Sequence, residues 1–147
     1  EMKEKKARMD DAMNATRAAI EEGIVAGGGI TFVRCIDSLN KLELSGDQKL
    51  GIPILEAALQ APIKQIATNA GFEGSVVCNK ILEGKDDFGF NAATGNYENL
   101  IENGIIDPTK VVRLAIQNAV SVAGLMFTTE ALIADKPKES KEKDSEK

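Results

Sequence analysis

The chain has 147 residues, 18 Lys and Arg against 23 Asp and Glu, and a formal net charge of −5. It contains no histidine and no tryptophan. The lack of histidine excludes a Ser-His-Asp or Cys-His nucleophilic pair and an imidazole metal ligand, so proton transfer would fall to carboxylates. The acidic balance argues against binding a nucleic-acid backbone, which requires a basic face.

Residues 1–22 are predicted to form one charged helix that carries a narrow apolar stripe. Asp11 lies two positions from a stripe residue, hence about 200° round the helix, on the opposite face. From spacing alone, Asp10 and Asp11 belong to a solvated helix face. No capping residue precedes Glu1, so we expect this chain to be a piece of something longer. The stripe consists of Met9, Met13 and Ile20.

A run of three glycines, Gly27–Gly29, follows this helix and precedes an apolar one. Glycine permits positive φ angles and a close approach of the backbone to a ligand or another segment. The N-terminus of the following helix favours anions such as phosphate. The run lacks the lysine of a Walker loop and the spacing of a dinucleotide fingerprint. A flexible hinge and a ligand-approach loop therefore both remain open.

The middle of the chain is predicted to fold as short, closely spaced helices that pack as an irregular bundle. Pro53 would lie in the first turn of its helix, and Pro62 would separate two helices. Cys35 and Cys78 are interpreted as buried reduced thiols, typical of a reducing compartment. No apolar run approaches the roughly 18 residues of a membrane span. The predicted helices cover about 30–42, 47–59, 63–69 and 76–82.

A small β-hairpin is predicted over 86–97, where Phe88 and Phe90 alternate with glycine. Asp107 followed by Pro108 is typical of an N-cap and first helical residue. The helix that follows, about 111–126, is the longest apolar one and is expected to be the buried central helix.

Residues 128–135 are predicted to end that helix and enter a short strand. Residues 136–147 contain only Lys, Glu, Ser, Asp and Pro and should be disordered. The predicted fold class is therefore mainly α, an irregular helical bundle with a small β-hairpin and a short C-terminal strand.

Four motifs in order resemble the C-terminal part of a bacterial-type (group I, GroEL-like) chaperonin. The resemblance covers nearly the whole chain. It fails only in the tail, where charged residues stand in place of Gly-Gly-Met repeats. The motifs are Ala12–Gly29, Gly89–Thr94, Gly104–Val111 and Ser121–Met126.

The resemblance implies three parts: an intermediate-domain helix (1–22), the C-terminal half of the equatorial ATP-binding domain (23–135) and a disordered charged tail (136–147). The apical domain and the Asp-Gly-Thr-Thr phosphate loop of the family would lie upstream. Mg and K would bind mainly in that missing half, and no metal ligand is assigned in this chain. We therefore expect this chain alone to be inactive as an ATPase.

The resemblance also assigns site residues position by position. Asp11 matches the catalytic aspartate, which swings over the nucleotide when the intermediate domain closes and orients the attacking water. Gly28 matches a glycine whose backbone lies against the sugar of ATP, and Asp107 matches the aspartate that holds the ribose hydroxyls. Lys64 and Glu73 fall, more loosely, where two rings meet. The adenine is lined by Asn91, Ala92 and Ala93.

The implied function is ATP-dependent protein folding by homo-oligomeric rings. The co-chaperonin lid and unfolded polypeptides would bind the missing apical domain, with no nucleic acid and no membrane as partner. The location would be the cytoplasm of a bacterium or the matrix of an organelle. The alternative is a non-enzymatic helical oligomerisation module whose glycine loop is only a hinge.

Overall fold

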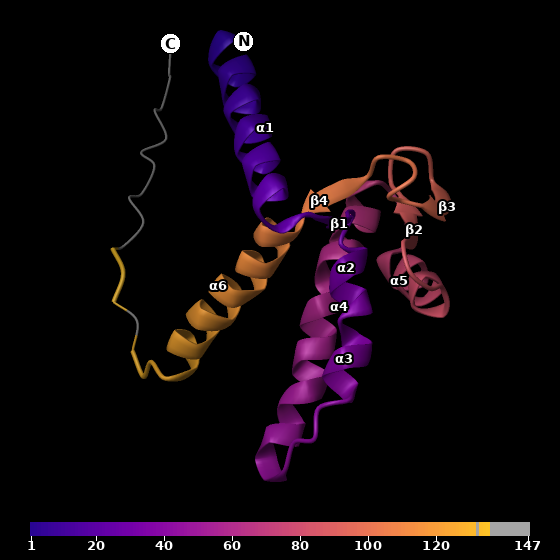
Figure 1. Cartoon of the computed structure of the whole chain (residues 1–147). Helices are drawn as coiled ribbons and strands as arrows, with labels where there is room; N and C mark the ends of the chain where they lie inside the picture. The colour runs from indigo at the N-terminus through magenta and orange to yellow at the C-terminus, as the bar shows by residue number, and fades with distance from the viewer. Residues whose placement is uncertain (132, 136–147) are drawn as a thin grey trace, which may run out of the picture. The chain divides into compact units, whose positions relative to one another are not determined.

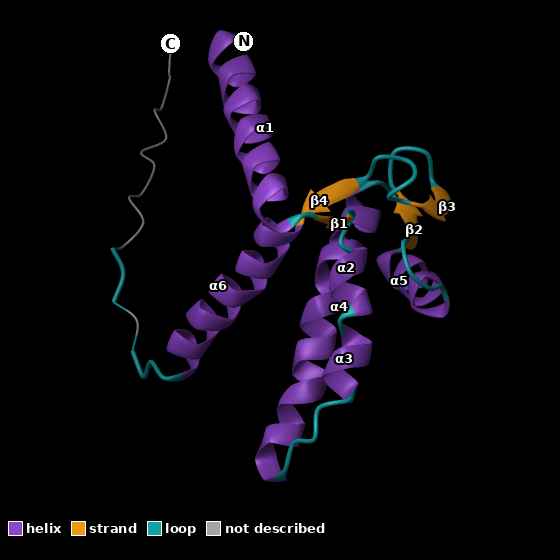
Figure 2. Ribbon diagram, viewed as in Figure 1, coloured by secondary structure: helices purple, strands orange, loops and turns teal. Residues whose placement is uncertain are grey.

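The structure is a computed structural model that describes residues 1–131 and 133–135 (Figure 1). It divides into two compact units, Glu1–Leu114 and Ala115–Lys147, each of which is treated by itself. The elements are predominantly helical (Figure 2), which confirms the mainly α fold class. They are α1 Met2–Glu22, β1 Ile24–Ala26, α2 Ile30–Arg34, α3 Ile36–Asn40, the 3₁₀ helix η1 Gly46–Leu50, α4 Gly51–Asn69, α5 Gly74–Glu83, β2 Phe88–Asn91, β3 Asn96–Asn99, β4 Ile106–Pro108 and α6 Thr109–Phe127.

Two small antiparallel sheets organise the first unit. The predicted hairpin is confirmed as β2 and β3, in which Phe88 pairs with Asn99 and Asn91 with Asn96. The second sheet pairs β1 with β4 and was not predicted, because three-residue strands leave almost no periodicity in the sequence. Its register places Val25 opposite Asp107. This pairing joins the segment before the glycines to the segment before α6.

The core of the first unit lies where α2, α4, α5 and the hairpin meet. Helices α4 and α5 approach closely at Gly74, which has no side chain. An ideal Cβ at this position would lie 2.6 Å from the carbonyl oxygen of Lys64. Gly89 likewise lets β2 lie against the side chains of Leu100 and Ile30. The largest fully buried side chains are Phe90, Ile30, Ile63, Ile81, Leu100, Val33 and Cys78.

Two of the predicted helix divisions are wrong: two predicted helices form one, and one predicted helix forms two. Pro62 does not separate two helices but lies inside the single helix α4, and Pro53 lies in its first turn as predicted. A proline removes one N–H donor, and α4 continues past it with Ile63 and Ala67 buried in the core. Conversely, the helix predicted over 30–42 is two short helices, α2 and α3, that meet at Cys35.

Helix α6 is not the buried central helix that its composition predicted. None of its residues is buried, and Phe127 is 85% exposed. By length and composition alone α6 could cross a membrane, so the prediction that no segment reaches that length is wrong. One such helix is weak support for a membrane span, because apolar helices that pack in soluble proteins meet the same criteria.

The apolar stripe of α1 is exposed as well, with Met9, Met13 and Ile20 each at least half exposed. Within α1, Ala18 is the buried residue. Of the two free cysteines, Cys78 is buried, as predicted, and burial raises the pKa of its thiol. The prediction for Cys35 is wrong, because its position between α2 and α3 leaves it exposed.

The described residues at the end of the chain, 128–131 and 133–135, form no strand. The short strand predicted there is therefore not found in them. Leu132, in the middle of that prediction, lies outside the described residues. The tail predicted over 136–147 lies outside them too.

Candidate functional site

Two of the three glycines, Gly27 and Gly29, are packed against neighbouring backbone. The N–H of Gly27 donates to the carbonyl oxygen of Ile105 at 2.9 Å, and an ideal Cβ on Gly27 would lie 3.2 Å from that backbone. Gly29 has a φ of +80° and caps α2 in the left-handed conformation, with its ideal Cβ position 3.0 Å from the backbone nitrogen of Ile63. Since Gly27 and Gly29 are buried between neighbouring segments, the packing argues against a freely flexible hinge.

Gly28 differs from its two neighbours because it is only half-buried. Its φ is +66°, a region that side-chain-bearing residues rarely adopt. The ideal Cβ position on Gly28 lies 3.8 Å from the carbonyl oxygen of Phe90 and 3.4 Å from Leu100. The glycine loop therefore lies beside the end of strand β2, where the predicted adenine-lining segment begins.

Asn91 has a local task in the hairpin turn. Its side-chain oxygen accepts a hydrogen bond from the N–H of Ala93 at 3.0 Å, and its side-chain nitrogen donates to Glu98 at 2.7 Å. Its carbonyl oxygen also accepts from Gly95 at 2.8 Å. The hydrogen bonds of Asn91 stabilise the turn that contains Ala92 and Ala93. Ala92 is half-buried and Ala93 is exposed, and both side chains are small.

Asp107 lies in strand β4, two residues before α6 begins at Thr109. Its carboxylate forms no side-chain hydrogen bond with any residue in 1–131 or 133–135, so the predicted N-cap role is wrong. The physical reason is that β4 pairs with β1 through Pro108, and the N–H of Thr109 is taken by the carbonyl oxygen of Gly23 at 3.1 Å. The Asp107 side chain is half-buried, and desolvation raises its pKa.

The structure thus brings most of the predicted site residues to one region. Gly27 contacts the segment that leads into Asp107, and Gly28 lies beside the segment that leads into Asn91. Asp11 does not join them. It is exposed on α1, eleven residues before Glu22, which is about 16 Å along the helix axis.

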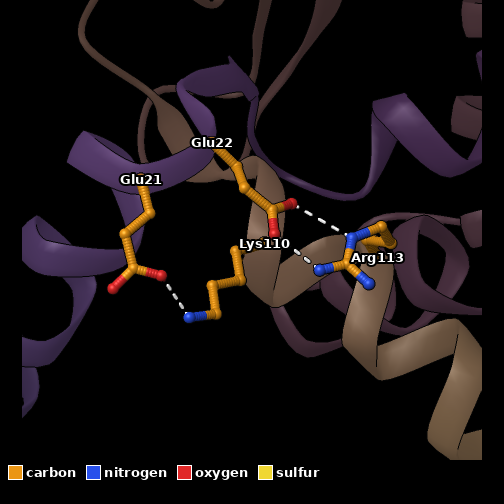
Figure 3. Close-up of polar contacts among 4 residues, drawn as sticks. All are labelled: Glu21, Glu22, Lys110 and Arg113. Atoms are coloured by element: carbon orange, nitrogen blue, oxygen red, sulfur yellow. Dashed lines mark hydrogen bonds and ion pairs between the residues drawn. The ribbon is translucent and has the colours of Figure 1, made fainter.

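Two ion pairs join the end of α1 to the start of α6 (Figure 3). The ammonium of Lys110 contacts the Glu21 carboxylate. The guanidinium of Arg113 donates from Nε and Nη2 to the two carboxylate oxygens of Glu22 at 3.0 and 2.5 Å. The bond from Arg113 lowers the pKa of Glu22, and the same carboxylate raises the pKa of Arg113.

Sequence reasoning missed these four residues. The available signal was a pair of acidic residues at the end of one helix and two basic residues three positions apart at the start of another. Spacing alone does not reveal that the two helix ends meet, because 89 residues separate Glu21 from Lys110.

The two residues predicted to contact a second ring have local partners here. The ammonium of Lys64 donates to Gln60 at 2.8 Å, one turn earlier on α4. The carboxylate of Glu73 accepts from the N–H of Ser75 and caps α5. A contact of either residue with a second ring stays a prediction.

A pocket of about 640 Å³ lies elsewhere on the first unit. It is bordered by α2, by α3 and by the loop between α5 and β2, and its lining includes Arg34, Asp37 and Asp86. Gly28, Asn91 and Asp107 do not line it. Within 1–131 and 133–135, no group of three or more His, Cys, Asp or Glu side chains could hold a metal ion.

Comparison with protein families assigns the class. The model of the TCP-1/cpn60 chaperonin family matches residues 1–137, which is nearly the whole chain. The chain therefore belongs to the TCP-1/cpn60 chaperonin family, whose members are protein-folding chaperones. The match includes every residue discussed above as part of the candidate site.

Proposed function

We propose that this chain is the C-terminal part of a group I chaperonin that couples ATP hydrolysis to protein folding, and that it forms one wall of the ATP site. The observation that carries the proposal is the state of Asp107. Its carboxylate is half-buried, its pKa is raised by desolvation, and it has no hydrogen-bond partner among the described residues. A desolvated carboxylate without a partner is costly unless a ligand supplies the missing donors.

The ribose of ATP supplies such donors through its hydroxyl groups. The neighbouring elements suit the rest of a nucleoside. Gly28 offers backbone without a side chain, and the small side chains of Ala92 and Ala93 leave room for a flat base. These residues would hold the sugar and the adenine, whereas the phosphates, Mg and K would be held mainly by the N-terminal half of the equatorial domain.

Asp11 is the proposed catalytic residue. As a carboxylate it can accept a hydrogen bond from the attacking water and orient that water toward the terminal phosphate. Its distance from the other site residues requires α1 to move toward the nucleotide, which would make hydrolysis depend on a domain closure. The exposure of most of α1 supports such a movement, because few buried contacts would have to break.

The proposal has three parts along the chain: residues 1–22 as the mobile intermediate-domain arm, 23–135 as half of the equatorial domain, and 136–147 as a charged tail. The complete protein would assemble into homo-oligomeric rings and bind a lid and unfolded polypeptides through its apical domain. Its location would be a bacterial cytoplasm or an organelle matrix. The chain alone would be inactive, because the phosphate-binding half is missing.

The test is made in the full-length chaperonin that contains this chain. Asp11→Ala should slow ATP hydrolysis by about 10²–10⁴-fold, the range for loss of a positioned acid or base, while ATP binding stays nearly intact. Asp10→Ala is the matched control, because it removes an equally exposed carboxylate about 100° away on the same helix. It should leave hydrolysis unchanged.

If the Asp11 and Asp10 variants lose equally small amounts of hydrolysis and binding, the catalytic assignment fails. That result would favour the non-enzymatic oligomerisation module. Nucleotide binding by the unaltered protein, measured by calorimetry, decides separately whether the ATP site itself exists.

A further inference from the structure

Arg34, at the end of α2, donates hydrogen bonds to backbone carbonyls and to no carboxylate within 1–131 and 133–135. Its Nη1 donates to the carbonyl oxygens of Ile81 at 2.8 Å and Gly84 at 2.9 Å. Its Nε and Nη2 donate to those of Asp86 and Phe88, both at 2.9 Å. One guanidinium therefore holds the last turn of α5, the following loop and the first residue of β2.

The geometry of these bonds depends on the planar guanidinium. Arginine has five N–H donors in a fixed fork, whereas lysine has three donors at a single point. A lysine at position 34 could reach one or two of the four carbonyls. The carbonyls at the end of a helix also have no intrahelical partner, so Arg34 satisfies groups that would otherwise need water or a cap.

The loop that Arg34 holds has a conformation that the local sequence does not favour. Asp86 has a φ of +50°, in the left-handed region that non-glycine residues rarely adopt. Gly84 permits the ring of Phe88 to pack against the backbone, because an ideal Cβ there would lie 2.2 Å from that ring. External bonds must hold such a loop in place, and Arg34 supplies them to both Gly84 and Asp86.

This loop leads directly into strand β2, which ends at Asn91, and α2 follows directly from the glycine loop. We propose that Arg34 is a positioning residue, which fixes the β2–β3 hairpin relative to Gly28 and so sets the width of the adenine-binding gap. The part of this inference that concerns nucleotide rests on the proposed function. The part that concerns the hairpin stands on the four hydrogen bonds alone.

The experiment compares Arg34→Lys and Arg34→Ala in the full-length chaperonin. Lys85→Ala is the matched control, because Lys85 is an exposed cation in the same loop. The first readout is amide hydrogen exchange over residues 84–99. Both Arg34 variants should exchange faster there than the unaltered protein, while Lys85→Ala should not. Equal rates of amide exchange in Arg34→Lys and Lys85→Ala would overturn the proposal that Arg34 holds this loop.

The second readout is steady-state hydrolysis of ATP and GTP. Misplacement of the hairpin should raise the KM for ATP by about ten- to a hundredfold and reduce the preference for ATP over GTP, with kcat for ATP changed little. A merely structural role would lower kcat and active protein without altering base preference. An unchanged KM and base preference, together with faster exchange, would overturn the role of Arg34 at the nucleotide. Failure of the unaltered protein to bind ATP would instead count against the proposed function and leave the exchange test valid.

Discussion

Arg113 donates two hydrogen bonds to the carboxylate of Glu22, and the two residues lie 91 positions apart in the sequence. A bidentate arginine–carboxylate pair is more directional than a single contact. The pair lies beside the β1–β4 sheet, where the chain leaves α1, and it ties the end of that helix to the first turn of α6. Any movement of α1 about its C-terminal end must therefore stretch or break the Arg113–Glu22 pair.

The first prediction concerns the pKa of Glu22. Because the bond from Arg113 lowers this pKa in the folded chain, Arg113→Gln should move the Glu22 midpoint upward toward the usual glutamate value of about 4.3. The pair stabilises the fold above the unfolded pKa, and this contribution is lost as pH falls through the lower folded pKa. Carboxyl NMR titration measures the midpoint.

The matched control for Glu22 is Arg8→Gln, because Arg8 pairs with Glu4 near the other end of α1. It should leave the Glu22 midpoint in place. A Glu22 midpoint that is the same in the unaltered chain and in Arg113→Gln would contradict the pairing.

The second prediction concerns Asp107. Desolvation raises its folded pKa, so stability should increase as pH falls through that value and level off below the unfolded pKa of about 3.9. At neutral pH the ionised Asp107 carboxylate lowers the free energy of unfolding. Asp107→Ala should therefore not lower the free energy of unfolding and should remove this pH dependence, as measured by urea unfolding at several pH values.

An N-cap role for Asp107 would give the opposite result. Loss of a capping side chain costs about 1 kcal/mol of stability. A decrease of that size in Asp107→Ala, restored in Asp107→Asn, would show that a side-chain oxygen at position 107 caps α6 after all.

The third prediction concerns the contact between α4 and α5. Gly74→Ala should lower the free energy of unfolding by about 1–3 kcal/mol, because the new methyl group would overlap the carbonyl oxygen of Lys64 at 2.6 Å. Gly51→Ala is the matched control at the start of a helix, with nothing within 4 Å of its Cβ position. It should be neutral or stabilise by up to about 1 kcal/mol. Equal effects of the two changes would refute the close helix contact.

The fourth prediction is that the 147-residue chain self-associates. Leu125 and Met126 on α6 are 69% and 73% exposed, and apolar surface of this kind tends to be covered by a partner. Sedimentation velocity over a range of concentrations should show species heavier than the monomer. Replacing Leu125 and Met126 by Gln should shift the distribution toward the monomer. A single monomeric species at every concentration in the unaltered chain would count against the prediction.

The sequence by itself determined the mainly α class, the hairpin, the extent of α1, the presence of α5, and the chaperonin family. These follow from local patterns, such as the alternation of Phe88 and Phe90 with glycine and the motif around Asn91. Helical spacing and short motifs depend on neighbours in the chain, so they can be read without the tertiary structure.

Only the tertiary structure decided the rest. The β1–β4 sheet, the Arg113–Glu22 pair and the four bonds of Arg34 join segments that are distant in sequence, and no local pattern encodes such a partner. Packing also overruled local rules at Pro62, where the helix continues beside Gly29. Asp107 does not take its predicted N-cap position, because the long-range pairing of β4 with β1 holds its backbone in a strand.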